Sequence, residues 1–362
     1  MTALTQNNTK RQIVQSLYLC KALMAFLIVT RHTTFCCKEA LLPLISIATP
    51  TFFCITGYFL YSASQERELG KSTRWAKKGL ILCISMNLIY LLHHTIDAAL
   101  CGRTYTPAFL VWESLPFGDS TIGNFVLNII TGISYSYHLW YLSAFWMAML
   151  IFYVLRRFCP AAIYATPLLF AWAQVCHAWG HDIFPGASEA VLIVLRCNSL
   201  AMALPFICTG YMIAKHSQAL LRIPYIPLWL VLCGAILYKG GLWLSYLQIH
   251  TYGWCYHITT YLMVCFTLLT CLKYSRARLP FLNTIGQHHS ANIYYTHILI
   301  YIHLLRTDFH HESIDALIVY LATIPLSYGI NHLGSAWKYI QKRVSSKTQG
   351  SVTGENNIKI SD

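Results

Sequence analysis

The sequence predicts an all-α protein, a polytopic helical membrane protein with about ten transmembrane helices in one domain. Of the 362 residues, 56% are hydrophobic and only 11% are charged, whereas soluble domains carry about a quarter charged residues. Apolar runs of about 20 residues, the length that crosses the hydrocarbon core as a helix, recur along the whole chain. The basic residues gather in alternate connections between these runs, which is typical of proteins that cross a membrane repeatedly.

Each apolar run is expected to form one span. The first follows about ten polar residues and has no small-residue cleavage site, so it is expected to be retained rather than removed as a signal peptide. The expected spans, in chain order, are residues 13–34, 41–61, 79–100, 138–158, 161–179, 190–214, 226–247, 254–272, 290–305 and 313–334. The amphiphilic connection 101–137 is expected to lie on the membrane surface as an interfacial helix. Residues 1–335 would then form the membrane domain, and the polar segment 336–362 is expected to be a disordered tail.

Charge placement predicts the orientation. An even number of spans puts both termini on one side, and short loops rich in Lys and Arg stay in the cytoplasm. Most of the 26 Lys and Arg residues fall on the side of the termini: Lys10, Arg11, Arg67, Lys71, Arg74, Lys77, Lys78, Arg156, Arg157, Lys215, Arg222, Lys273, Arg276, Arg278, Lys338, Lys342, Arg343, Lys347 and Lys359. Both termini are therefore expected in the cytoplasm. The formal charge of +13 reflects this asymmetry, so no nucleic-acid partner is expected.

The 14 cysteines lie mostly inside apolar runs, with no C-x-x-C pair and no metal-ligand spacing. They are interpreted as small buried hydrophobic residues, and no metal site is expected. Cys36, Cys37 and Cys101 fall in predicted outside loops, where either free thiols or a disulfide fit the pattern. Gly57, beside large aromatic residues in the second run, is expected to permit close approach of another helix.

Three cations lie within the apolar runs: Lys21, Arg31 and Arg196. A cation near mid-helix costs about 2.5 to 3.5 kcal/mol on insertion scales and usually faces protein or a water-filled cavity. Lys21 and His32 are eleven residues apart, which returns to within about 20° of the same helix face and rises about 16 Å. Read alone, the pair also fits a Lys that snorkels to the inner headgroups and an imidazole at the outer interface.

The order Lys21-x10-His32 in the first span resembles the leading signature of acyltransferase family 3. Most members have Arg at the first position, and Lys lacks the bidentate fork of Arg. Further elements similar to that family follow in order along nearly the whole chain: TPTFFCITGYFLY with Pro50, Phe52, Phe53, Thr56, Gly57 and Tyr58; Arg74-x-x-Lys77 with Lys78; HLWYL from His138 to Leu142; and IYYTH from Ile293 to His297.

The resemblance implies a membrane acyltransferase domain over residues 1–335 of a multi-pass protein of the bacterial inner membrane. Family members take an acyl group, usually acetyl, from cytoplasmic acyl-CoA and deliver it to a hydroxyl beyond the membrane. The expected function is therefore an O-acyltransferase, most simply an O-acetyltransferase, that modifies a surface polysaccharide or other glycan. Acyl-CoA is expected as donor substrate, with no permanently bound cofactor; the expected partners are this donor, a glycan acceptor and membrane lipids.

The same resemblance, joined to the spacing on the first helix, predicts the site. Basic residues on the cytoplasmic side are expected to hold the CoA phosphates: Lys21, Arg74, Lys77 and Lys78. His32 is expected to act as the general base on the acceptor hydroxyl, with a covalent acyl-His intermediate as the alternative. Residues expected to orient His32 or to bind the acceptor are His138, Trp140, Tyr294, His297 and Arg196.

Two other function classes fit parts of the pattern. Intramembrane cations and ten spans also suit a transporter or flippase of a lipid-linked sugar, although the internal repeats common in transporters are not evident. In a membrane sensor or scaffold, the same polar groups would be structural. Label entering glycan from radiolabelled acetyl-CoA distinguishes the enzyme from both.

Overall fold

The computed structural model describes residues 14–36, 38–100, 102, 137–185, 199–246 and 258–354, and this part of the chain is helical with no strand. The helices are α1 (Gln15–His32), α2 (Lys38–Leu60), α3 (Gln65–Leu100), α6 (Trp140–Phe158), α7 (Ala162–Ala165), α8 (Pro167–Ile183), α10 (Leu204–Lys215), α11 (Ser217–Leu220), α12 (Ile226–Tyr246), α13 (Ile258–Lys273), α14 (Pro280–Thr284), α15 (Ser290–Leu304) and α16 (Asp315–Gly354). A 3₁₀ turn η1 (Tyr137–Leu139) precedes α6, and π-helical segments η2 (Ser199–Ala203) and η4 (Ile285–His289) precede α10 and α15.

The all-α prediction is confirmed, and a helix overlaps each of the ten predicted segments. By length and composition, four helices of the described chain are long and apolar enough to cross a membrane: Ala40–Leu60, Gln65–Leu100, Trp140–Phe158 and Asp315–Ser335. Shorter apolar helices occupy other predicted segments, and the count of ten spans stays a prediction. Most of the connection 101–137 lies outside the described residues.

Two helices run further than the apolar pattern predicts. α3 begins at Gln65 rather than at residue 79, because its charged first half is still amphipathic and buries Leu69, Ser72 and Ala76. α16 continues to Gly354, past the boundary expected at residue 335. Hydropathy locates the part of a helix that lies in lipid, and it does not detect a polar continuation of the same helix.

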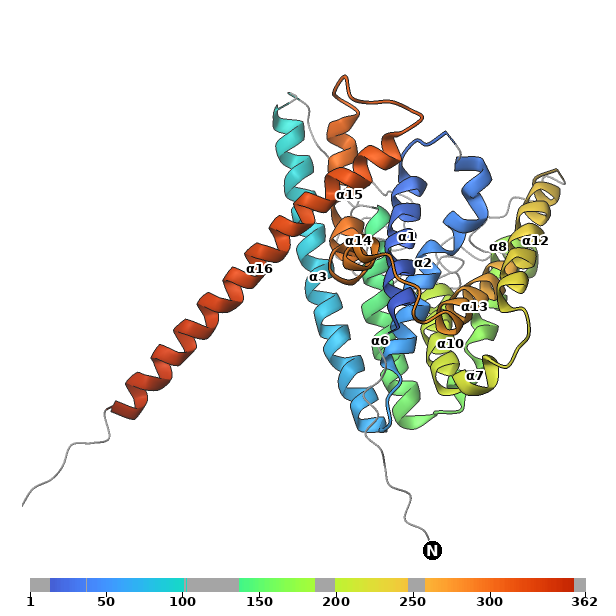
Figure 1. Ribbon diagram of the computed structural model, residues 1–362, viewed down its shortest axis with the longest axis horizontal. Coiled ribbons are helices and arrows are strands. Elements are labelled where there is room, and N and C mark those ends of the chain that lie inside the picture. The colour runs from blue at the N-terminus through green and yellow to red at the C-terminus, as the bar shows by residue number, and fades with distance from the viewer. Residues whose placement is uncertain are drawn as a thin grey trace, which may run out of the picture.

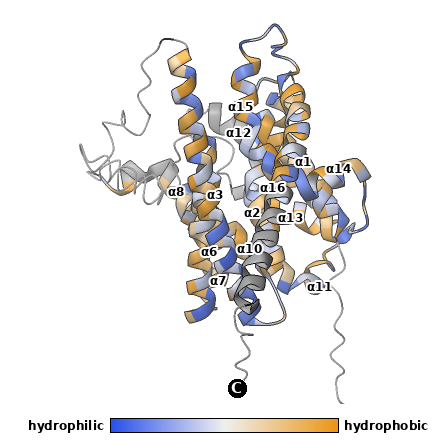
Figure 2. Ribbon diagram, turned by 90° about the vertical axis from the view of Figure 1, so that its left-hand side faces the viewer, coloured by the Kyte–Doolittle hydropathy of each residue, from blue (hydrophilic) through white to orange (hydrophobic). Residues whose placement is uncertain are grey.

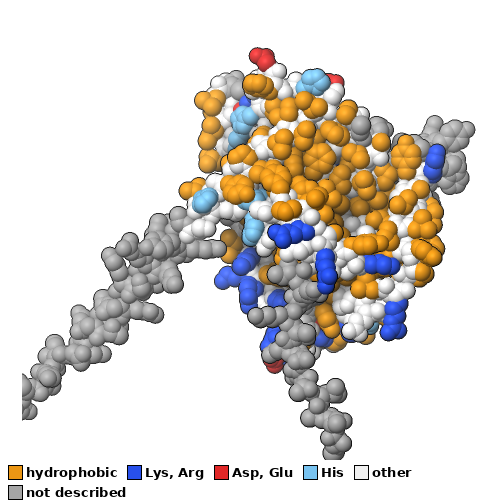
Figure 3. Space-filling model, viewed as in Figure 1, with side chains coloured by type: hydrophobic (Ala, Val, Ile, Leu, Met, Phe, Trp, Pro, Cys, Tyr) orange, Lys and Arg blue, Asp and Glu red, His pale blue; other side chains and the backbone are white. Residues whose placement is uncertain are grey.

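α1 occupies the centre of the bundle, where it contacts α2, α13, α15, α16 and η4 (Figure 1). α3 packs chiefly against α6, and its other face exposes Ile81, Leu88 and Leu92. Hydrophobic residues, drawn in orange, occur along most of the length of α3 and α6 in Figure 2. On the face in Figure 3, apolar side chains cover the middle, and Lys and Arg gather below them. Figure 1 has the same view and shows that α1 begins toward this lower side and ends toward the upper side of the molecule.

α2 and α10 cross at two glycines, where their backbones touch. A Cβ added at Gly57 would lie 1.8 Å from the carbonyl oxygen of Ile207, and a Cβ added at Gly210 would lie 1.8 Å from that of Cys54. Small residues are used in this way where helices pack closely in membranes. The prediction for Gly57 is confirmed, and the contact fixes α2, which supplies one wall of the cavity described below.

We expect Gly57→Ala to destabilise the fold, because the added methyl meets a backbone carbonyl that cannot rotate away. Overpacking of this kind costs about 1 to 3 kcal/mol, and the unfolding temperature in detergent should fall accordingly. Gly70→Ala is the matched control, since nothing lies within 4 Å of its added Cβ and Ala favours a helix over Gly by about 1 kcal/mol. Equal unfolding temperatures for Gly57→Ala and wild type would contradict the close crossing.

Candidate functional site

Three histidines from distant parts of the sequence meet near the His32 end of α1. His32 is the last residue of α1, His138 lies in η1, and His297 lies in the middle of α15. Their ring centroids are separated by 6.3 Å between His32 and His138, 5.3 Å between His32 and His297, and 5.4 Å between His138 and His297. His138 and His297 are buried and His32 is partly buried. The structure thus brings together the three histidines that the sequence predicted as site residues.

Hydrogen bonds to main-chain oxygens hold parts of this cluster in place. Nδ1 of His297 donates to the carbonyl oxygen of Tyr294 at 2.8 Å, so the neutral ring carries its proton on Nδ1 and has its lone pair on Nε2. That Nε2 is buried and has no hydrogen-bond partner within the described part of the chain. The hydroxyl of Tyr294 donates to the carbonyl oxygen of His138, and the Tyr90 ring lies 4.8 Å from the His138 ring.

The segment after His32 is anchored to the start of α16. The Thr34 hydroxyl donates to the buried Asp315 carboxylate at 2.8 Å, which also accepts from Nδ1 of His310 at 2.6 Å. Lys38 donates to the carbonyl oxygens of Arg31 and Thr33, at the C-terminal end of α1. Burial, and then the nearby Arg31 guanidinium, lower the pKa of Lys38. These contacts hold the end of α1, and with it the backbone of His32.

A cavity of about 410 Å³ lies further toward the Gln15 end, between α1, α2 and α15 on one side and α3 and α6 on the other. Most of its wall is apolar or aromatic. Its lining consists of Lys21, Ile28, Phe52, Ile55, Thr56, Phe59, Trp75, Lys78, Gly79, Leu82, Tyr141, Leu142, Phe145, Ser290, Ala291, Tyr294 and Tyr295.

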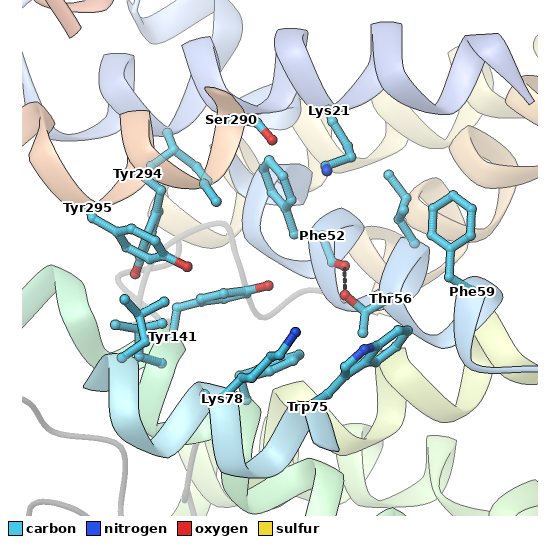
Figure 4. A pocket seen from close by; sticks show the side chains of 17 residues that line it. Lys21, Phe52, Thr56, Phe59, Trp75, Lys78, Tyr141, Ser290, Tyr294 and Tyr295 are labelled. Atoms are coloured by element: carbon cyan, nitrogen blue, oxygen red, sulfur yellow. Dashed lines mark hydrogen bonds between the residues drawn. The ribbon is translucent and has the colours of Figure 1, made fainter. Parts of the chain in front are cut away.

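Two ammonium groups from opposite walls face this cavity. Figure 4 shows the nitrogens of Lys21 on α1 and Lys78 on α3 directed into the same space. Among the described residues its lining includes no carboxylate, so it suits an anion attached to an apolar body. Arg74 and Lys77 do not line the cavity; they are exposed on the preceding turn of α3.

The cavity stops short of the histidine cluster. Its wall on α1 reaches Ile28, one helical turn before His32, and His32 does not line it. Tyr294 belongs to both places: it lines the cavity, and its ring centroid lies 6.2 Å from that of His138 and 6.1 Å from that of His297. The cavity therefore ends before the histidine cluster, and Tyr294 lies at the boundary between the two.

The remaining predicted residues have different surroundings. Trp140 is partly buried, its ring centroid lies 6.2 Å from that of Phe53 in the core, and it does not line the cavity. Arg196 lies outside the described residues. Across the described residues, no group of three His, Cys, Asp or Glu is arranged to hold a metal ion.

Several site residues were not predicted although they stand inside the motifs. Thr56 and Phe52 of the second-span motif line the cavity, as do Tyr141 of HLWYL and Tyr295 of IYYTH. The motifs were therefore a usable signal for these positions. Asp315 had no comparable signal, because it is a lone acid at the start of an apolar run.

The residues of the cavity and of the histidine cluster lie within the part of the chain that matches a known protein family. A family model described as an acyltransferase domain matches residues 14–332, which include both lysines of the cavity and all three histidines of the cluster. No curated protein and no solved structure matches the chain. Since the match covers nearly the whole chain, the protein belongs to this acyltransferase family.

Proposed function

We propose that the protein is a membrane O-acyltransferase that takes an acyl group, most simply acetyl, from cytoplasmic acyl-CoA and transfers it to a hydroxyl of a surface polysaccharide or other glycan. The observation that carries the proposal is the arrangement along α1. A cavity lined by Lys21 and Lys78 lies along this helix, and a histidine cluster lies at its His32 end. The rise of about 16 Å between Lys21 and His32 separates the two in depth across the membrane.

The proposed orientation in the bacterial inner membrane puts both termini in the cytoplasm. Basic residues gather at the side of the molecule that carries the Gln15 end of α1 (Figure 3), and short basic loops stay cytoplasmic. Lys21 and Lys78 then face the donor side, and His32 faces the acceptor side.

Donor binding uses charge at the cavity and apolar contact within it. The volume of about 410 Å³ lies within the range of about 300 to 1,000 Å³ found for small-molecule sites. The ammonium groups of Lys21 and Lys78 attract phosphate oxygens by charge-assisted hydrogen bonds, and the aromatic lining covers the less polar arm of the carrier. Arg74 and Lys77 add positive charge at the exposed surface of α3. Acyl-CoA is here a substrate, not a resident cofactor.

The transfer step needs a base at the acceptor hydroxyl. His32 takes the hydroxyl proton while the oxygen attacks the thioester carbonyl carbon; the C–O ester bond forms, the C–S bond breaks, and the proton passes to the CoA thiolate. An imidazole suits this work because its reference pKa of about 6.5 lies near neutral pH. His297 and His138 act as positioning residues that bound the His32 ring. Because the cavity ends before His32 and Tyr294 lies at that boundary, the proposed transfer includes a displacement of the Tyr294 ring.

We expect His32→Ala to lower acyl transfer by about 10² to 10⁴, the usual contribution of a general base. The measurement is the rate at which label from radiolabelled acetyl-CoA enters glycan in membranes that contain the protein. His303→Ala is the matched control, since His303 is exposed on α15 and pairs with His93 rather than with the cluster. A folded His32→Ala protein with the wild-type rate would exclude His32 as the base.

We expect Lys21→Ala to raise KM for acyl-CoA by about tenfold or more, because a hydrogen bond to a charged group contributes about 1.5 to 3 kcal/mol. Lys21→Arg keeps the charge and should restore most of the affinity. Lys215→Ala serves as control, since Lys215 pairs with Tyr164 on another part of the molecule. An unchanged KM in Lys21→Ala would place the donor phosphates elsewhere.

A further inference from the structure

Tyr294 is the lining residue whose ring also contacts the histidine cluster. In Figure 4, Tyr294 and Tyr295 stand at one end of the cavity, while Phe59 and Trp75 stand at the other. Beyond Tyr294 lie the rings of His138 and His297, at 6.2 Å and 6.1 Å between centroids. A group that moves from this end of the cavity toward the histidines therefore passes the Tyr294 ring.

The Tyr294 ring is held at several points, and its free side faces the cavity. Its hydroxyl donates to the carbonyl oxygen of His138, and its ring centroid lies 5.2 Å from that of Tyr141. The side chain is 6% exposed, and the nearby Leu142 and Ile293 are 1% and 0% exposed. Close-packed protein interiors are sensitive to a volume change of even one methylene. The free-energy cost of displacing the ring is therefore expected to rise with the size of the displacement.

We propose that the Tyr294 ring determines acyl-chain length and restricts the transferred group to the size of acetyl. The inference rests on the proposed function, in which the thioester enters from the cavity and its acyl group projects toward His32. Each added methylene would need a further displacement of a ring that is packed and hydrogen-bonded. The bonds broken and formed are the same for every chain length, so the preference among donors isolates the fit of the chain.

The experiment compares kcat/KM for acetyl-CoA and butanoyl-CoA in membranes that contain wild-type protein or a variant. Apolar pockets discriminate by about 10- to 200-fold per methylene, so wild type should strongly prefer acetyl. Tyr294→Leu removes the ring and should reduce that preference by about tenfold or more. Tyr294→Phe keeps the ring and should retain the wild-type preference, whatever its overall rate. Phe59→Leu removes a ring from the opposite end of the cavity and should also retain it.

A Tyr294→Leu protein that transfers acetyl with the wild-type preference would overturn the inference, and so would an equal loss of preference in Phe59→Leu. If Tyr294→Leu does not accumulate in the membrane, Tyr294→Met is the second variant, since its unbranched side chain fills irregular space, and the same two results apply to it. A wild-type protein that transfers no acyl group from either donor would overturn the proposed function itself. A failure of the chain-length inference alone leaves acetyl transfer by wild type intact.

Discussion

A lysine placed within an apolar helix is the constraint on which the site depends. An ammonium group cannot lie in hydrocarbon without a large cost, so Lys21 must face protein, water or an anion. In this structure it faces a cavity whose opposite wall carries Lys78. Because α1 is one continuous helix from Gln15 to His32, the direction of Lys21 also fixes the face on which His32 emerges. The cavity and the histidine cluster are thereby placed on one side of the same helix.

The helices on the two sides of the cavity pack in different ways. α2 and α10 touch through Gly57 and Gly210, and η4 approaches α1 so closely that a Cβ on Gly286 would lie 1.8 Å from the carbonyl oxygen of Tyr18. α3 is different, since it packs mainly on α6 and turns an apolar face outward. The space between these two groups of helices holds Lys21 and Lys78.

The sequence predicts the helical class, the position of most helices and the three histidines, because apolar length and motif order are local properties. It does not predict that Trp140 packs against Phe53, or that Tyr294 lies between the cavity and the histidines, because both depend on the relative rotation of helices far apart in the chain. The sequence does not predict a role for Asp315 for a similar reason. Its partner His310 is five residues away in the sequence, but Thr34 becomes its neighbour only where the end of α1 meets the start of α16, and no spacing along the chain predicts that contact.

Lys21 stands where most members of the family that the sequence resembles have Arg, and the surroundings of Lys21 in the cavity bear on this difference. A guanidinium binds phosphate through a planar fork, whereas an ammonium acts as a point charge with rotatable donors. Lys21 and Lys78 approach the same space from opposite walls, and among the described residues its lining supplies no carboxylate. In the proposed function, two lysines on opposite walls would offer the donor phosphates two directions of approach, whereas one arginine offers a single planar fork.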